Sequence, residues 1–243
     1  MINIQIITLF PEYFDSFKKT SIIARALEHH QANIECVNFR DYTLDKHNNV
    51  DDTICGGGAG MLLVCQPIVD CLNDIKKPNS RVVLLTPQGQ LFNQKKAIEL
   101  SANEDVILIC GHYEGFDERI RHYVDEEISI GDYVLTGGEA GALVIADALI
   151  RLNDGVIREA SHEDDSFSNG LLEYPQYTRP IEYNGEKVPE ILLSGHHALI
   201  AQWRLKESLR KTYLRRPDLL KKRILNKQEQ QLLTEVIDEE KNK

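Results

Sequence analysis

Two runs of four apolar residues, each followed by a turn, constrain the fold of this chain more than any other feature. Val82–Leu85 precedes Pro87, and Val106–Ile109 precedes Gly111. Short continuous apolar runs are typical of strands that are buried on both faces, as in a parallel sheet covered by helices. Because helical patterns lie between the strands, the sequence predicts an α/β domain with a largely parallel sheet.

The predicted strands and helices alternate along the first two thirds of the chain. Strands are predicted over Ile2–Thr8, Asn33–Asn38, Arg81–Thr86, Asp105–Cys110 and Glu127–Ile130. Helices are predicted over Ser21–His30 with Ser21 as its N-cap, Gln66–Ile75, Asn93–Ser101, Phe116–Tyr123 and Gly138–Leu152. We therefore expect one domain over residues 1–160, an acidic linker over 161–172, and a smaller, mostly helical domain over 173–243.

Charge is distributed unevenly between these parts. The chain of 243 residues has a formal net charge of −10. Residues 201–243 nevertheless hold 12 Lys and Arg against 7 Asp and Glu, and ten of the basic residues lie between Arg204 and Lys227. Such asymmetry indicates a basic patch facing a polyanion, although a solvated helix face has the same composition.

Composition also limits the compartment and the class of protein. The longest apolar stretch, Ala140–Ile150, contains Asp147 and is far shorter than a membrane span. No basic segment precedes the first predicted strand, as it would in a signal peptide. The five cysteines are an odd number without a C-x-x-C pair, which disfavours a disulfide scaffold and a zinc ribbon. We expect a cytoplasmic protein with no membrane association.

Glycine-rich turns follow three of the predicted strands. They are Thr86–Gly89, Cys110–Gly115 and Ile130–Gly138, whereas no G-x-G-x-x-G, P-loop, H-E-x-x-H or G-x-S-x-G motif is present. In open parallel sheets, ligands bind beyond the carboxyl ends of the strands, and glycine lets backbone approach a ligand closely. Ordinary turns would explain any one of these loops, but three together favour a ligand site.

Beyond these loops, the sequence resembles one family along nearly its whole length. The matching segments are Leu9–Glu12, Asp45–His47, Val50–Asp52, Gly56–Met61, Gly111–Gly115, Asp117–Arg119, Ile130–Gly138, Asp165–Phe167, Tyr177–Pro180, Leu193–His197, Trp203–Arg204 and Leu214–Pro217. They resemble the bacterial tRNA (guanine-N1)-methyltransferases, the TrmD family of the SPOUT class. The resemblance implies a parallel sheet with a deep trefoil knot, which no local pattern would reveal.

The resemblance implies that the glycine-rich loops bind S-adenosyl-L-methionine as methyl donor. The residues expected to line that site are Thr86, Pro87, Gly89, Gly111, Tyr113, Ile130, Gly131, Asp132, Tyr133, Val134, Leu135, Gly137 and Gly138. The family transfers the methyl group to N1 of the guanosine immediately 3′ of the anticodon. Two departures from the family pattern lie near the site: His112 replaces a frequent Arg, and Glu173–Pro175 replaces a more usual Asp-Cys-Pro.

Three catalytic residues follow from the resemblance. Asp165 is expected to remove the N1 proton as general base, Arg151 to hold the guanine O6, and Glu114 to lie near the donor and the target base. Each also has a purely structural explanation. The run His162–Asp165 resembles a solvated acidic linker, and Arg151 is predicted to lie in the last turn of a helix, where cations are favoured.

The remaining expectations concern partners. The resemblance implies a homodimer with an active site at the subunit interface, tRNA as substrate, and a magnesium dependence for which the sequence offers no assignable site. The residues expected to contact tRNA are Arg204, Arg210, Lys211, Arg215 and Arg216. Two alternatives stay open: another SPOUT enzyme that methylates a ribose 2′-hydroxyl, and a non-catalytic RNA-binding relative that keeps a donor pocket.

Overall fold

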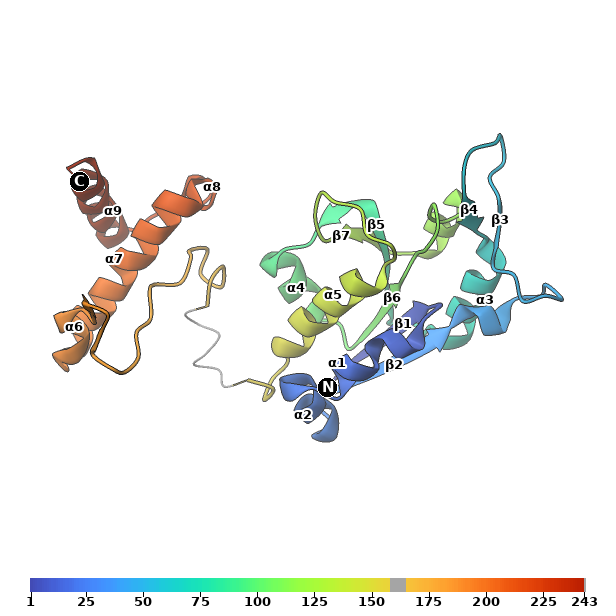
Figure 1. Ribbon diagram of the computed structural model, residues 1–243, viewed down its shortest axis with the longest axis horizontal. Helices are drawn as coiled ribbons and strands as arrows, with labels where there is room; N and C mark the ends of the chain where they lie inside the picture. Colours follow the sequence, from blue (N-terminus) through green and yellow to red (C-terminus); the bar gives the residue numbers. More distant parts are fainter. Residues whose placement is uncertain (158–164, 243) are drawn as a thin grey trace. The chain divides into compact units, whose positions relative to one another are not determined.

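The computed structural model describes residues 1–157 and 165–242. The chain divides into two compact units, Met1–Glu159 and Ala160–Lys243 (Figure 1). The N-terminal residues of the predicted linker, 161–164, lie outside the described residues. Each unit is described by itself below.

The first unit is built on a five-stranded sheet in which every described neighbouring pair is parallel. Its strands are β1 (Ile2–Thr8), β2 (Ala32–Asn38), β5 (Arg81–Leu91), β6 (Asp105–Ile109) and β7 (Glu126–Ser129). The order across the sheet is β2-β1-β6-β5-β7. The predicted parallel α/β domain is therefore confirmed.

Alternate residues of the central strands enter two separate cores. Ile4 of β1 and Leu108 of β6 are buried in one core, whereas Ile7 and Ile107 are buried in the other. Because side chains alternate between the faces of a strand, a strand that is buried on both faces needs apolar residues at nearly every position. This explains the two apolar runs.

Helices cover both faces of the sheet (Figure 1). The first face packs against α1 (Asp15–Lys18), α2 (Ser21–Glu28), α4 (Gln94–Ser101) and α5 (Glu139–Arg151). The second face packs against α3 (Cys65–Ile75) and the short 3₁₀ helices η2 (Phe39–Tyr42) and η3 (Glu118–Tyr123), while a further 3₁₀ helix, η1 (Pro11–Phe14), belongs to the first face.

Two local expectations were wrong. The N-cap of α2 is Thr20, not Ser21, and its side chain makes no capping hydrogen bond; Ser21 has φ 54°. Strand β5 does not end at Thr86 but runs to Leu91, because its second part pairs again with β7. Leu85 and Gln90 both have Ile128 as partner, so the residues between them bulge out of the ladder beside β7.

A small antiparallel hairpin, which the sequence did not reveal, supports one of the glycine-rich loops. It consists of β3 (Asp51–Thr53) and β4 (Met61–Leu63). The backbone N–H of Leu63 donates to the carbonyl of Gly115 at 2.9 Å, and that of Glu114 donates to the carbonyl of Met61 at 3.0 Å. The loop that follows β6 is therefore held from outside the main sheet.

The second unit is mostly helical. It contains a two-residue hairpin, β8 (Glu182–Tyr183) and β9 (Glu186–Lys187), and the helices α6 (Glu190–Leu193), α7 (His197–Arg215), α8 (Pro217–Lys221) and α9 (Lys227–Lys241). Leu171, Leu209 and Leu232 form its core. Asn226 and Glu229 form a reciprocal capping box that starts α9.

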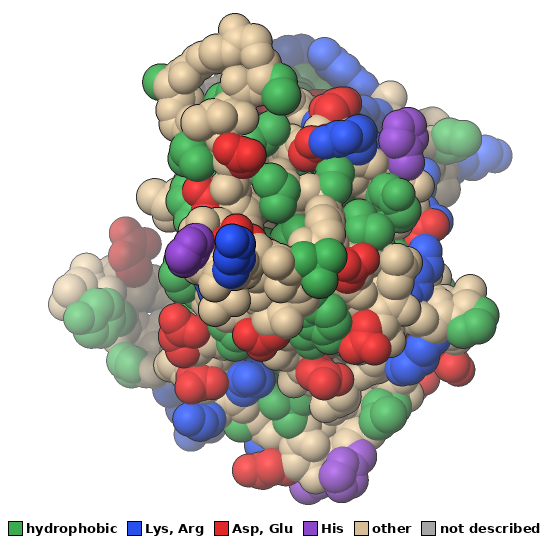
Figure 2. Space-filling view, turned by 90° about the vertical axis from the view of Figure 1, so that its right-hand side faces the viewer, with side chains coloured by type: hydrophobic (Ala, Val, Ile, Leu, Met, Phe, Trp, Pro, Cys, Tyr) green, Lys and Arg blue, Asp and Glu red, His purple; other side chains and the backbone are tan. Residues whose placement is uncertain are grey.

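The surface seen in Figure 2 carries side chains of both signs. Asp and Glu lie among Lys, Arg and hydrophobic side chains, and basic side chains do not gather there into one patch. None of the helices in the described part of the chain has the length and apolar character needed to cross a membrane.

Candidate active site

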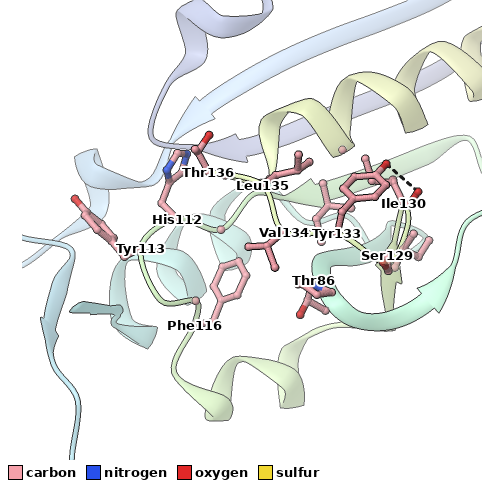
Figure 3. A pocket seen from close by; sticks show the side chains of 18 of the residues that line it. Thr86, His112, Tyr113, Phe116, Ser129, Ile130, Tyr133, Val134, Leu135 and Thr136 are labelled. Atoms are coloured by element: carbon pink, nitrogen blue, oxygen red, sulfur yellow. Dashed lines mark hydrogen bonds between the residues drawn. The ribbon is translucent and has the colours of Figure 1, made fainter. Parts of the chain in front are cut away.

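The three glycine-rich loops meet around one cavity of about 240 Å³ in the first unit (Figure 3). The Thr86–Gly89 loop is the bulge within β5, and the other two loops follow β6 and β7. The cavity therefore lies at the carboxyl ends of β6 and β7, beside the bulge of the neighbouring strand β5. Phe116 and Val134 project into the space between the loops, and the Tyr133 hydroxyl donates to the Ile130 carbonyl of its own loop at 3.2 Å. The wall offers backbone groups and apolar side chains, which suits a planar ligand.

The loop after β7 approaches the loop after β6 as closely as glycine allows. The backbone N–H of Gly138 donates to the Gly111 carbonyl at 2.9 Å. A Cβ at Gly138 would lie 2.7 Å from the Cα of Cys110, closer than real Cβ contacts come. Glycine is therefore required here because backbone packs on backbone.

A buried polar chain fixes the same two loops. Glu139, which is 3% exposed, accepts a hydrogen bond from Thr8 Oγ1 at 2.6 Å, and its other oxygen lies 2.7 Å from His112 Nε2. The His112 ring also packs edge-on against Phe10, with centroids 4.7 Å apart. This chain ties α5 and the loop after β6 to the end of β1, so the cavity walls are held in place.

Below the cavity, Cys110 is completely buried, and this burial raises the pKa of its thiol well above the ordinary value. A thiol that stays protonated is a poor nucleophile. Cys110 therefore packs against Gly138 without contributing chemistry.

Most of the residues predicted to hold the donor line the cavity. Those that do are Thr86, Pro87, Gly111, Tyr113, Ile130, Gly131, Tyr133, Val134, Leu135, Gly137 and Gly138. Gly89 and Asp132 are absent from the lining. Gly89 instead packs against the backbone of Glu127 and Ile128 in β7, and Asp132 is exposed on the outside of its loop.

Eight further residues line the cavity and were not among the predicted donor-binding or catalytic residues. They are Leu85, His112, Gly115, Phe116, Ile128, Ser129, Thr136 and Gly141. Thr136 belongs to a loop that was predicted as a whole and could have been included. Ile128 and Gly141 lie inside a strand and a helix, and only the tertiary packing, in which Gly141 lies beside Leu85 and Ile130, brings them to the cavity.

The predicted catalytic residues lie in three different places. Glu114 lines the cavity. Arg151 is the last residue of α5, whose N-cap is Gly138 at the cavity. At 1.5 Å per residue, the helix separates the two positions by about 20 Å. Arg151 is therefore too distant to contact a ligand in the cavity of its own chain.

Asp165 belongs to the second unit and is the first described residue after the gap. Its carbonyl accepts a hydrogen bond from the backbone N–H of Ser168 at 3.1 Å, within a turn. The rest of the acidic run, 162–164, lies outside the described residues.

The basic residues of the second unit have unequal surroundings. Arg210 bonds Glu207 from its own helix and Glu239 and Glu240 from α9. Burial alone would lower the pKa of Arg210, but these hydrogen bonds outweigh it and raise the pKa. The donors of Arg210 are therefore already used inside the unit.

The other predicted tRNA contacts are more accessible. Arg204 and Arg215 are exposed and Lys211 is half-buried, and the Arg204 guanidinium lies 4.8 Å from the centroid of the Tyr174 ring. Arg216 pairs with Asp218, and it also approaches the ring of Phe167 at 5.7 Å.

No metal site is evident. Among residues 1–157 and 165–242, no three His, Cys, Asp or Glu side chains come together as ligands. The described residues therefore offer no cage of three such ligands, although magnesium is commonly held by one or two carboxylates together with water and substrate phosphates.

Comparisons with known proteins identify a family over most of the sequence. A sequence model of the family described as tRNA (Guanine-1)-methyltransferase TrmD matches residues 2–222. The chain is 56% identical over 239 residues to a tRNA (guanine-N(1)-)-methyltransferase of Bacillus cereus strain B4264, covering 96% of this chain and 98% of that protein. It is 55% identical to the same enzyme of Bacillus anthracis strain CDC 684, with the same coverage. With the family matched over nearly the full length and the cavity built from the family's loops, the chain belongs to the TrmD family.

Proposed function

We propose that this protein is a methyltransferase that modifies N1 of guanosine in tRNA, with S-adenosyl-L-methionine as methyl donor and the guanosine immediately 3′ of the anticodon as target. One observation carries the proposal: three glycine-rich loops, at the carboxyl ends of β6 and β7 and in the bulge of β5, form a single cavity in a chain that belongs to the TrmD family. Ribose methylation and a non-catalytic role have no comparable support, because the similar proteins are named as guanine-N1 enzymes.

The cavity suits the proposed donor. The backbone around Gly111, Gly131 and Gly138 offers N–H and C=O groups, and Leu135 and Ile130 offer apolar contact. When bound, the donor supplies an electrophilic methyl group on sulfur. The loops hold it in one orientation, and positioning of two reactants can contribute up to roughly 7–11 kcal/mol to lowering the barrier.

Asp165 is the proposed general base. N1 of guanine carries a proton and becomes nucleophilic as that proton leaves, so a carboxylate within hydrogen-bond reach accelerates transfer by roughly 10²–10⁴-fold. Arg151 is proposed to stabilise the negative charge that develops on O6. Glu114, at the cavity wall, is proposed to orient the target base.

The distance of about 20 Å between Arg151 and the cavity of the same chain supports a shared active site. We propose a homodimer in which the donor cavity of one subunit works with Arg151 and Asp165 of the other. Two-fold symmetry then gives two equivalent sites. No step is assigned to magnesium, because no three His, Cys, Asp or Glu side chains of the described residues come together as ligands.

We assign tRNA binding to the second unit, through Arg204, Lys211, Arg215 and Arg216, and a structural role to Arg210 because its partners are glutamates. A tRNA substrate and the odd number of cysteines favour the cytoplasm. We also propose that the chain threads a deep trefoil knot, which the match to the TrmD family supports.

The test is methyl transfer from labelled S-adenosylmethionine to an unmodified tRNA transcript with guanosine 3′ of the anticodon. A twin transcript with adenosine at that position is the control. The expected product, identified by mass spectrometry, is N1-methylguanosine in the first transcript alone. A 2′-O-methylated product would refute the proposed chemistry, and no product despite donor binding would refute this acceptor.

A further inference from the structure

The second unit contains its own cavity, of about 350 Å³, which the proposed reaction does not use. It lies between the segment that begins at Tyr174 and the first turns of α7. Its volume falls in the range of small-molecule sites, roughly 300–1,000 Å³. All the residues that line it belong to the second unit.

Three aromatic rings line this cavity. They belong to Tyr174, Tyr177 and Trp203. The Tyr177 and Trp203 rings are 6.4 Å apart between centroids and inclined at 52°. Leu192 and Ile200 add apolar surface. Tyr177 is 49% exposed, so its ring is not part of a closed core and is available to a ligand.

A cation completes the site. Arg204 lines the cavity and lies over the Tyr174 ring at 4.8 Å. Its neighbours along α7 differ from it: Lys206 is bound by Glu235 and Glu239, and Arg210 by three glutamates. Among the described residues, no carboxylate pairs with Arg204, and none belongs to the lining of the cavity. Negative charge on a ligand is therefore not repelled there.

Planar aromatic surface next to an arginine that pairs with no carboxylate of the described residues is the combination that binds unpaired nucleotides. Bases stack on aromatic rings whatever their sequence, and arginine adds cation–π and phosphate contacts. The chemistry of the lining therefore favours one nucleotide of a single-stranded RNA loop.

We propose that this cavity, lined by Tyr174, Tyr177, Trp203 and Arg204, is a stacking subsite for an unpaired nucleotide of the tRNA that is distinct from the methylated guanosine. The proposal rests on tRNA being the substrate. The ring of Trp203 or Tyr177 stacks on the base, and Arg204 contacts the adjacent phosphate. Holding a second loop nucleotide fixes the register of the RNA, so the subsite contributes affinity and orientation rather than chemistry.

Trp203 makes the site directly observable, because it is the only tryptophan of the chain. Titrating the full-length protein with an anticodon stem-loop RNA should quench its fluorescence. The same RNA with one abasic loop position, tested position by position, should lose this quenching at a single position other than the target guanosine. Unchanged fluorescence upon saturation with the intact RNA would overturn the proposal.

The matched variants are Tyr177→Ala and Tyr183→Ala. Both tyrosines are exposed, at 49% and 70%, and both belong to the second unit, but Tyr183 lies in the β8–β9 hairpin outside the cavity. We expect Tyr177→Ala to weaken RNA binding by roughly 5- to 150-fold, the range that stacking of one base gives. Tyr183→Ala should bind as the native protein does. Trp203→Phe, which keeps an aromatic ring, should retain most of the affinity.

RNA affinity and product identity separate this proposal from the proposed function. If Tyr177→Ala binds RNA as tightly as Tyr183→Ala while N1-methylguanosine still forms, the subsite is refuted and the function stands. If no N1-methylguanosine forms but the position-specific quenching and the Tyr177→Ala defect persist, the function is refuted and the nucleotide site stands. A change in subunit association of Tyr177→Ala without a change in RNA affinity would assign the cavity to a protein interface and also refute the subsite.

Discussion

The absence of a side chain at Gly138 allows two loops of the cavity to pack closely together. A Cβ there would lie 2.7 Å from Cys110 Cα and 2.9 Å from the Gly111 nitrogen. We expect Gly138→Ala to weaken donor binding by roughly tenfold or more, because backbone must retreat and overpacking costs about 1–3 kcal/mol. Calorimetric titration with S-adenosylmethionine measures the loss.

Gly141→Ala is the matched control for this variant. Gly141 also lines the cavity and lies one turn further along α5, but a Cβ there would meet Leu85 at 3.6 Å, an ordinary contact. Alanine in a helix is about 0.5–1 kcal/mol more favourable than glycine, so this variant should keep donor affinity and gain stability. Equal donor affinities for the two variants would contradict the steric explanation.

The proposed role of Asp165 requires a carboxylate that accepts a proton, and not merely a side chain of that size. We expect Asp165→Asn to bind the donor normally and to reduce kcat by roughly 10²–10⁴-fold, because the amide cannot accept the N1 proton. Single-turnover methyl transfer measures the loss, and Asp154→Asn, an exposed carboxylate in the other unit, is the control. Native turnover in Asp165→Asn would remove it as the base.

Some features of single residues could not be predicted from the sequence. The three loops that line the cavity are marked by their glycines, but the bond between Thr8 and Glu139 joins residues 131 positions apart. Nothing near Glu139 in the sequence indicates that a buried carboxylate will meet His112. For Arg151, the sequence indicated a possible catalytic residue but not its position. Its distance from the cavity follows from the length of α5 in the structure.

At the scale of elements, ion pairs as well as packed leucine side chains hold α7 against α9. Lys206 and Arg210 of α7 bond Glu235, Glu239 and Glu240 of α9. Ten basic residues between Arg204 and Lys227 indicated a basic patch, but several of them have acidic partners from the next helix. A local charge count therefore overstates the positive charge that this unit presents to a polyanion.

This junction predicts an acid-sensitive contribution to stability. Hydrogen bonds from Lys206 and then Arg210 lower the pKa of Glu239 from its ordinary 4.5 to about 2. Because the folded-state pKa is depressed, the contribution is fully present above about pH 4.5 and is lost as the pH falls toward 2. The side chain is 47% exposed, so solvent screening limits the contribution to about 1 kcal/mol or less.

Glu239→Gln should therefore lower the thermal stability of the second unit at pH 7, and less so in high salt. The difference from the native protein should shrink as the pH approaches 2. Asp238→Asn is the control, since Asp238 is 65% exposed and its described ion pair is a 4.0 Å contact with Lys241 of the same helix. A melting difference for Glu239→Gln that is independent of pH would contradict the ion-pair explanation.

Helices and strands could be predicted where residues close together in the sequence determine them. The apolar run Val106–Ile109 identified β6, and Asn93 identified the start of α4, where its side chain accepts a bond from the Lys96 backbone. The extension of β5 to Leu91 was not predictable, because it depends on Ile128 pairing twice. The β3–β4 hairpin escaped notice since each strand has three residues and lies in a polar, glycine-rich stretch.

At the scale of the whole molecule, the residues proposed to act in the reaction lie in separate parts of one chain. The donor cavity and Arg151 belong to the first unit, at opposite ends of α5, and Asp165 belongs to the second. A homodimer combines them if each active site takes its cavity from one subunit and its Arg151 and Asp165 from the other. This arrangement makes a prediction that no single-chain site can share.

Two inactive variants should complement each other after subunit exchange. Gly138→Val blocks the cavity, and Asp165→Asn removes the base. A mixed dimer then holds one site with both defects and one with none. Equal mixing makes half of the dimers mixed, so about a quarter of native activity should return. The controls are each variant without treatment, and each variant taken through the exchange procedure without the other. Because a site built within one chain carries its own defect into every dimer, absence of recovery, with exchange verified by mass spectrometry, would place the cavity and Asp165 in the same subunit's site.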